Sequence, residues 1–102
     1  MAVYALAQIS IHDRERYDRY VARFAVALAP FNGRVLAADE SPDVIEGSWS
    51  HEKVVLLEFS NRQEFERWSQ SPTYREIAKD RVASTTGCVV VVEGFAPAGG
   101  AR

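Results

Sequence analysis

The residue types best suited to binding chemistry in this sequence gather on one helix predicted between Ser71 and Arg81. Ser71 followed by Pro72 is typical of a helix start, because serine caps the first turn and proline needs no donor there. At about 100° per residue, Tyr74, Ile77 and Arg81 then share one face of the helix. The sequence therefore places a cation on an otherwise apolar face.

Arg81 is for this reason the leading candidate for an anion site. A guanidinium is planar and permanently charged, and its fork of donors fits a carboxylate or an enolate. The alternative is structural: the side chain extends to solvent, or it pairs with a carboxylate such as Glu46 or Glu58. The two interpretations differ in whether the head of Arg81 faces a concave pocket or a neighbouring acid.

Four aromatic residues could line a pocket for a flat organic ligand, because each offers a large apolar area and a polar tip. They are Tyr20, Trp49, Trp68 and Tyr74. Core packing and dimer contacts are the usual duties of such side chains, and for Trp68 we favour the core. Trp49 lies beyond a predicted strand end, where a ring could flank a cleft or contact a partner subunit.

Proton transfer, if the protein catalyses a reaction, is assigned to His51 or Glu46. Histidine has an ordinary pKa near neutrality, and burial would raise the pKa of a glutamate. An ion pair with an arginine is the commoner outcome for a carboxylate, and His12 is expected at the surface. The spacing of the two histidines fits no metal site, so we predict no metal and no cofactor. Haem ligation by His51 is a further alternative.

The charge balance argues against nucleic acid as a partner. With 12 basic and 14 acidic residues the formal net charge is -2, whereas a nucleic-acid-binding domain needs a concentrated basic surface. The arginines between positions 14 and 23 alternate with acidic residues, which is typical of the solvent side of a helix. We therefore predict no nucleic-acid partner.

A membrane span and a disulfide framework are not expected either. The first apolar stretch, Val3 to Ile11, is too short to cross a bilayer, and no basic leader precedes it. The lone cysteine, Cys88, begins a valine run in a predicted strand and is expected to be a small buried apolar residue. The predicted location is cytoplasmic, with no membrane partner.

Hydrophobic periodicity predicts the elements that must position these residues. Val3 to Ile11 alternates as a strand, and its alanines suggest close packing behind it. Asp13 can cap a helix whose apolar positions recur every three to four residues and which ends before Pro30. A second strand is predicted over 34–38, and residues 44–47 are predicted as a short strand or an extended arm.

The second half of the chain repeats this alternation of strand and helix. Lys53 to Phe59 is the third main strand, and a helix follows that is capped by Ser60 or equally by Asn61. The helix restarts at Ser71. Residues 87–94 close the chain as a strand, because they are rich in β-branched side chains.

The order strand, helix, strand, strand, helix, strand matches the split βαβ, ferredoxin-like plan. This is an α+β fold with an antiparallel sheet and both helices on one face. The third and last strands are apolar on both faces, and the helices can cover only one of them. We therefore predict that a second copy covers the open sheet face in a two-fold homodimer.

Eight pieces of residues 1–95 together resemble one known family. They are 4–9, 17–20, 32–34, 44–49, 54–59, 68–74, Arg81 and 92–94. The chain resembles the DUF1330 family within the dimeric α/β-barrel, ferredoxin-like superfamily. The resemblance implies this fold and dimer, and its wider relatives include cofactor-free monooxygenases, small isomerases and haem-dependent enzymes. Ser69 stands where a second aromatic is expected after Trp68, which would open the adjoining pocket.

These observations lead to two hypotheses for a single domain over 1–95, followed by a tail over 96–102 that is predicted to be disordered. In the first, a homodimer holds a small anionic or aromatic metabolite between each sheet and its helices. Arg81 binds the anion, and any reaction is that of a cofactor-independent isomerase or oxygenase. In the second, the protein is a non-catalytic binding or interaction module whose aromatics serve the dimer and whose Arg81 is an ion-pair partner.

Overall fold

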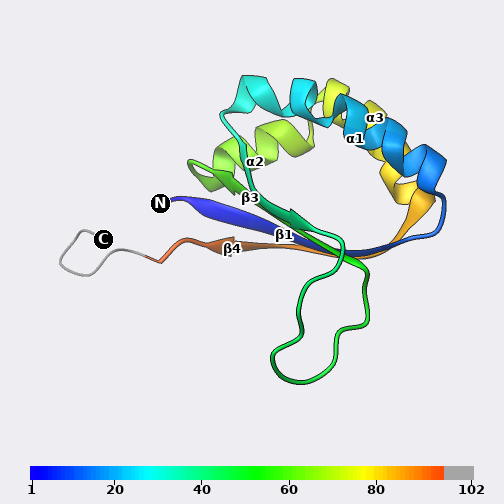
Figure 1. Ribbon diagram of the computed structural model, residues 1–102. Coiled ribbons are helices and arrows are strands. Elements are labelled where there is room, and N and C mark those ends of the chain that lie inside the picture. Colours follow the sequence, from blue (N-terminus) through cyan, green and yellow to red (C-terminus); the bar gives the residue numbers. More distant parts are fainter. Residues whose placement is uncertain (96–102) are drawn as a thin grey trace.

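Four antiparallel strands form one sheet, and all the helices lie on one of its faces (Figure 1). The structure is a computed structural model that describes residues 1–95. The strands are β1 (Val3–Ile11), β2 (Arg34–Asp39), β3 (Lys53–Phe59) and β4 (Thr85–Glu93). Their spatial order is β2-β3-β1-β4. The predicted order of elements and the α+β plan are confirmed, whereas the tail predicted over 96–102 lies outside the described residues.

The helical layer consists of three α-helices and one short 3₁₀ turn among the described residues. These are α1 (Arg14–Leu28), η1 (Ala29–Phe31), α2 (Arg62–Ser69) and α3 (Pro72–Ser84). Figure 1 shows α1 and α3 running together above the sheet, with α2 near one end of it. None of the helices within residues 1–95 is long and apolar enough to span a bilayer.

Side-chain caps begin the three α-helices at the predicted positions. Asp13 accepts a hydrogen bond from the backbone N–H of Arg16 at 3.2 Å, and Ser71 accepts one from Tyr74 at 3.2 Å. Of the two caps considered for α2, Asn61 is the one used, and it accepts from the N–H of Glu64 at 2.8 Å. Each cap satisfies a donor that the helix itself leaves unpaired, so the helix starts are set locally.

The two faces of the sheet differ in what covers them. Residues opposite one another in the ladder share a face, so Ala5 and Leu57 point toward the helices, while Leu6, Leu56 and Val90 point away. No helix covers this second face, the outer face, in the part of the chain that is described (Figure 1). Val90 is 46% exposed there. An apolar strip therefore crosses the middle of the sheet on its open side.

Cys88 also belongs to the outer face, and the prediction that it is buried is wrong for this chain by itself. It pairs with Gln8 in the ladder between β1 and β4 and is exposed. The valine run to which it belongs alternates between the two faces. Its position in that alternation places its thiol on the side that the helices do not cover.

Residues 40–52 form a long irregular loop that extends away from the sheet (Figure 1). The short strand considered over 44–47 does not form, and the alternative of an extended arm is closer to what is seen. No strand among the described residues runs alongside to supply a ladder partner, and Gly47 turns the chain with a φ of 81°. Ile45 is 87% exposed on this loop.

Candidate functional site

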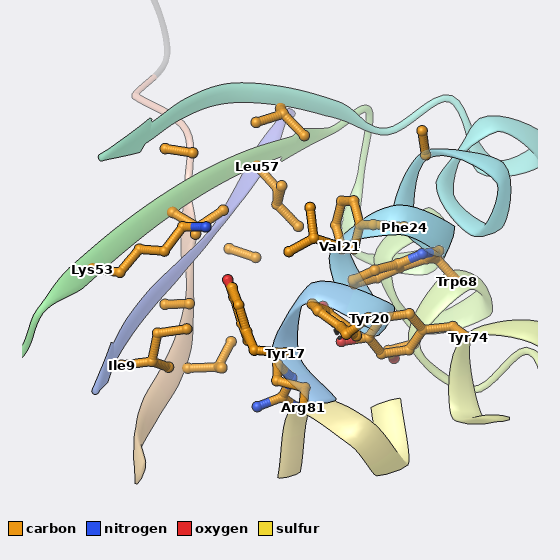
Figure 2. A pocket seen from close by; sticks show the side chains of 18 of the residues that line it. Ile9, Tyr17, Tyr20, Val21, Phe24, Lys53, Leu57, Trp68, Tyr74 and Arg81 are labelled. Carbon is orange, nitrogen blue, oxygen red and sulfur yellow. Dashed lines mark hydrogen bonds between the residues drawn. The ribbon is translucent and has the colours of Figure 1, made fainter. Parts of the chain in front are cut away.

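A cavity of about 340 Å³ lies between the inner face of the sheet and the helices (Figure 2). Small-molecule sites in proteins usually measure about 300–1,000 Å³, so this volume suits a small organic ligand. Among residues 1–95, two cationic side chains line it, Lys53 and Arg81, and no acidic side chain does. The cavity is therefore an apolar space whose charged lining is cationic.

Three small side chains contribute to the floor of the cavity, among larger apolar ones. Ala5 and Ala7 of β1 and Ala38 of β2 face it. The alanines of the first strand had suggested close packing behind it. That prediction is wrong for Ala7, which is only partly buried and lines the cavity.

The upper wall is aromatic and is built from three helices. Trp68 of α2 contacts Tyr74 of α3 with ring centroids 4.0 Å apart, and Phe24 of α1 lies 5.8 Å from Trp68. All three line the cavity, as do Phe65 and Ser69. Trp68 is buried, as favoured for a core residue, and it is at the same time part of the wall. Ser69, the departure from the expected aromatic, also faces the space.

Tyr20 and Tyr74 form a buried polar pair in this wall. Their hydroxyl oxygens share a hydrogen bond of 3.0 Å. Burial raises the pKa of the Tyr20 hydroxyl far above its ordinary value, and the neighbouring Tyr74 raises it further. Tyr20 is therefore a neutral hydroxyl at any pH near neutrality, able to donate or accept a hydrogen bond but not to act as a base.

The raised pKa of Tyr20 predicts a loss of stability at alkaline pH. The folded protein keeps this hydroxyl neutral, whereas in the unfolded chain it ionises at its ordinary value of 10.0. The stabilisation is complete below pH 10 and declines above it by about 1.4 kcal/mol for each pH unit. Urea denaturation of the wild type and of Tyr20→Phe between pH 9 and 11.5 measures this. An equally steep decline in Tyr20→Phe would contradict it.

Arg81 of α3 is partly buried and lines the cavity beside these hydroxyls. Burial disfavours its charged form, but the neighbouring Tyr74 and Tyr20 more than offset this and hold its pKa above the ordinary value. Within residues 1–95 it forms no ion pair, and Glu58, an alternative partner, binds Arg34 instead. The guanidinium is therefore a cation whose charge no described carboxylate matches.

Other arginines show how unusual this is. Arg16 of α1, for example, binds Asp80 of α3 at 2.9 Å. Arg23 and Arg75 also form no ion pair within the described residues, but both are exposed, so water solvates them. Arg81 alone among the arginines of residues 1–95 combines partial burial with the lack of a carboxylate partner.

Lys53 and Tyr17 are cavity residues that the sequence reasoning missed. The side chain of Lys53 is only 11% exposed, and its Nζ lies 4.8 Å from the centre of the Tyr17 ring. Both line the cavity. A signal was present, because Lys53 stands two residues before Val55 and four before Leu57, which places all three on the same face of β3.

Three predicted site residues lie outside the cavity. His51 sits just before β3, where its Nδ1 lies 3.3 Å from Oγ of Ser10. Glu46 is exposed on the 40–52 loop. Trp49 belongs to the same loop and is partly buried, and its indole Nε1 is buried with no acceptor among the described residues. None of the three lines the cavity, so the structure does not bring the expected proton-transfer groups to Arg81.

No metal-binding group is evident in the described part of the chain. Within residues 1–95, no cluster of three or more His, Cys, Asp or Glu side chains could hold a metal ion. The expectation that the protein uses no cofactor stays a prediction.

The order of the strands and the one-sided helical layer define a ferredoxin-like α+β domain, here with a cavity between its two layers. The chain belongs to the family described as Domain of unknown function (DUF1330), whose sequence profile matches residues 2–95. The resemblance noted in the sequence is thereby confirmed. No curated protein matches the sequence.

Solved structures share the fold over nearly the whole chain. A protein of unknown function from Rhodopseudomonas palustris, RPA0582, has a TM-score of 0.80 at 16% identity, over 94% of this chain and 84% of its own. SnoaB, a cofactor-independent oxygenase from Streptomyces nogalater, has a TM-score of 0.65 at 13% identity, over 95% and 96%. A dimeric ferredoxin-like protein of unknown function from Jannaschia sp. CCS1 has 0.65 at 20%, over 90% and 96%. At these identities the likeness concerns the fold.

Proposed function

We propose that the protein is a homodimer that binds a small organic anion with an apolar, partly aromatic body in the cavity of each subunit. The observation that carries the proposal is Arg81, a partly buried guanidinium that lines the cavity and has no carboxylate partner within residues 1–95. The ligand's acidic group would occupy the place that a carboxylate side chain takes elsewhere in the protein.

The energetics of burial support an anion as the missing partner. A charge removed from water is costly unless it is paired, and a guanidinium can hold a carboxylate through two parallel hydrogen bonds. The lining supplies no acid of its own, so a bound anion would be the first negative charge in the cavity. The surrounding rings and alanines would contact the apolar remainder of the ligand.

If a reaction occurs, the cavity can contribute orientation and electrostatic stabilisation. The hydroxyls of Tyr20 and Tyr74 stand beside Arg81 and could donate to a developing oxyanion. The fold is shared with a cofactor-independent oxygenase, and an oxygenase or isomerase that uses no cofactor is the catalytic form of this proposal. Neither His51 nor Glu46 lines the cavity, so either could transfer a proton only to a ligand that extends beyond it.

The homodimer is proposed from the outer face. Leu6, Leu56 and Val90 form its centre and have no covering layer within the described residues. A second copy related by a two-fold axis would cover the strip with the same strip. A protein of the same fold is described as dimeric. The alternative, a module without a ligand, requires Arg81 to be paired within the protein.

The proposal is tested by calorimetric titration and thermal unfolding with a panel of aromatic and aliphatic carboxylates. A ligand at one hundred times its dissociation constant is expected to stabilise the fold by about 2.7 kcal/mol. Arg81→Met is expected to weaken binding at least about tenfold, because a hydrogen bond to a charged group contributes about 1.5–3 kcal/mol. The matched control is Arg75→Met on the same helix, which is exposed and should bind as the wild type does.

Two results would overturn the proposal. One is that no acid in the panel binds to the wild type. The other is that Arg81→Met, shown by circular dichroism to be folded, binds a carboxylate as tightly as Arg75→Met does.

A further inference from the structure

We propose that the cavity selects ligands that carry two anionic oxygen groups, of which Arg81 binds one and Lys53 binds the other. This inference rests on the proposed function, because it requires the same cavity to hold the ligand. It adds a chemical class: an aromatic or conjugated acid with a second carboxylate, phenolate or enolate oxygen.

The position of Lys53 in β3 directs its side chain into the cavity. It is the first residue of β3 and pairs with Ile9 in the ladder, so its side chain leaves the sheet on the helix side. Its side chain is 11% exposed and lines the cavity. Lysines are mostly exposed, and those that are largely buried are usually paired. A partner for the ammonium group is therefore to be expected.

The protein itself provides only a weak partner. The nearest carboxylate oxygen is Oε2 of Glu40, 3.8 Å from Nζ. That carboxylate already accepts hydrogen bonds of 2.8 and 3.1 Å from the guanidinium of Arg14, and this contact lowers the pKa of Glu40. Tyr17 adds a cation–π contact at 4.8 Å. Among residues 1–95 the ammonium has no hydrogen-bond acceptor for its three donors.

Lys53 and Arg81 lie toward the same end of the cavity. The backbone N–H of His12, just beyond β1, donates to the carbonyl of Ser84, three residues after Arg81. The ladder places Lys53 beside Ile9, near the same end of β1. Figure 2 shows the two cationic heads with Tyr17 between them in the view. This is the polar end of the cavity.

The opposite end is apolar. Trp68 contacts Phe59, which pairs with Val3 at the other end of β1, and Phe24 lies against Trp68. A ligand with its acidic groups at the polar end would lay its ring or chain against this wall. A monoanion would match one of the two cations, whereas a dianion matches both, since no acidic side chain lines the space.

The test compares benzoate with its three dicarboxylate isomers, phthalate, isophthalate and terephthalate, by calorimetric titration of the full chain. The isomers hold the second carboxylate at increasing distance from the first, so together they test a range of separations. At least one is expected to bind ten times more tightly than benzoate. Lys53→Met should weaken that isomer much more than it weakens benzoate and so remove the preference, while Lys53→Arg should keep the preference.

The controls separate this inference from the proposed function. Lys79→Met removes an exposed lysine and should change neither affinity, which accounts for any general effect of net charge. If benzoate binds through Arg81 but no dicarboxylate binds more tightly, or if Lys53→Met weakens both ligand types equally, the inference is overturned and the proposed function stands. If none of the four acids binds but another carboxylate of the wider panel does, the inference alone is overturned; if no acid of that panel binds, both are overturned.

Discussion

Replacing Gly87 with alanine is expected to destabilise the protein by about 2 kcal/mol or more. Gly87 has a φ of 154°, in a region that side chains rarely adopt, and such strain costs about 1–3 kcal/mol. A Cβ at this position would also collide with the backbone of β1, meeting Cα of Ile9 at 2.8 Å and the carbonyl carbon of Gln8 at 2.9 Å. Backbone cannot move aside as a flexible side chain can, so the first pairs between β1 and β4 must open.

Gly47→Ala is the matched control for this prediction. Gly47 also has a positive φ, 81°, but a Cβ there would meet no atom within 4 Å. It lies in the exposed loop after β2, so alanine there should cost only the strain of the positive φ, about 1 kcal/mol. Urea denaturation gives both values, and hydrogen exchange should show lost protection in β1 and β4 for Gly87→Ala. Equal losses for the two variants would contradict the backbone collision.

Leu6→Lys is expected to convert the proposed homodimer to a monomer that still folds. Leu6 stands in the centre of the outer face, opposite Leu56 on one side and Val90 on the other. In a monomer the new ammonium would reach water. In a dimer built on this face it would be buried without a partner, at a cost of about 3 kcal/mol or more, which weakens association by at least about a hundredfold.

Sedimentation equilibrium measures the effect, with Val26→Lys as the control. Val26 lies on α1, is 75% exposed and belongs to the helical layer, so its substitution should leave the assembly unchanged. A wild-type protein that stays monomeric at 100 µM, or a Leu6→Lys variant that still forms dimers, would show that the outer face does not hold the subunits together.

Much of this fold can be predicted from local patterns in the sequence. Alternation fixed the faces of β1 and β3, and side-chain caps at Asp13, Asn61 and Ser71 determined where the helices begin. Such signals depend on neighbours within a few residues, so they can be recognised in the sequence without knowledge of the tertiary structure. The prediction that Tyr74 and Arg81 share one face of a helix rests on the same local periodicity.

The site was harder to predict, because it depends on how far the layers stand apart. Alanines in β1 fit close packing and an open floor equally well by sequence, and only the placement of α1 and α3 decides between them. The exposure of Cys88 likewise depends on which face the helices cover. The alternation within β3 places Lys53 on the inner face, but a single charged residue at a strand end is more often solvated than buried.

His51 and Glu46 show the opposite error. Their chemistry and their place near a strand end favour them, yet the loop that carries them extends away from the sheet (Figure 1) and neither lines the cavity. Long loops between strands have no periodicity from which a direction could be inferred. The residue types thus indicated that proton transfer was possible, while the course of the loop determined whether these groups lie beside Arg81.

Because Ala5, Ala7 and Ala38 line the cavity, its volume depends on the size of the side chains at these positions as well as on the backbone. Ala7 and Ala38 occupy ladder positions on the inner face and are not fully buried, so a larger side chain at either site would reduce the space. Relatives with the same backbone can therefore differ in the length of the ligand they admit through one or two substitutions. In this architecture, divergence of ligand size requires no change of fold.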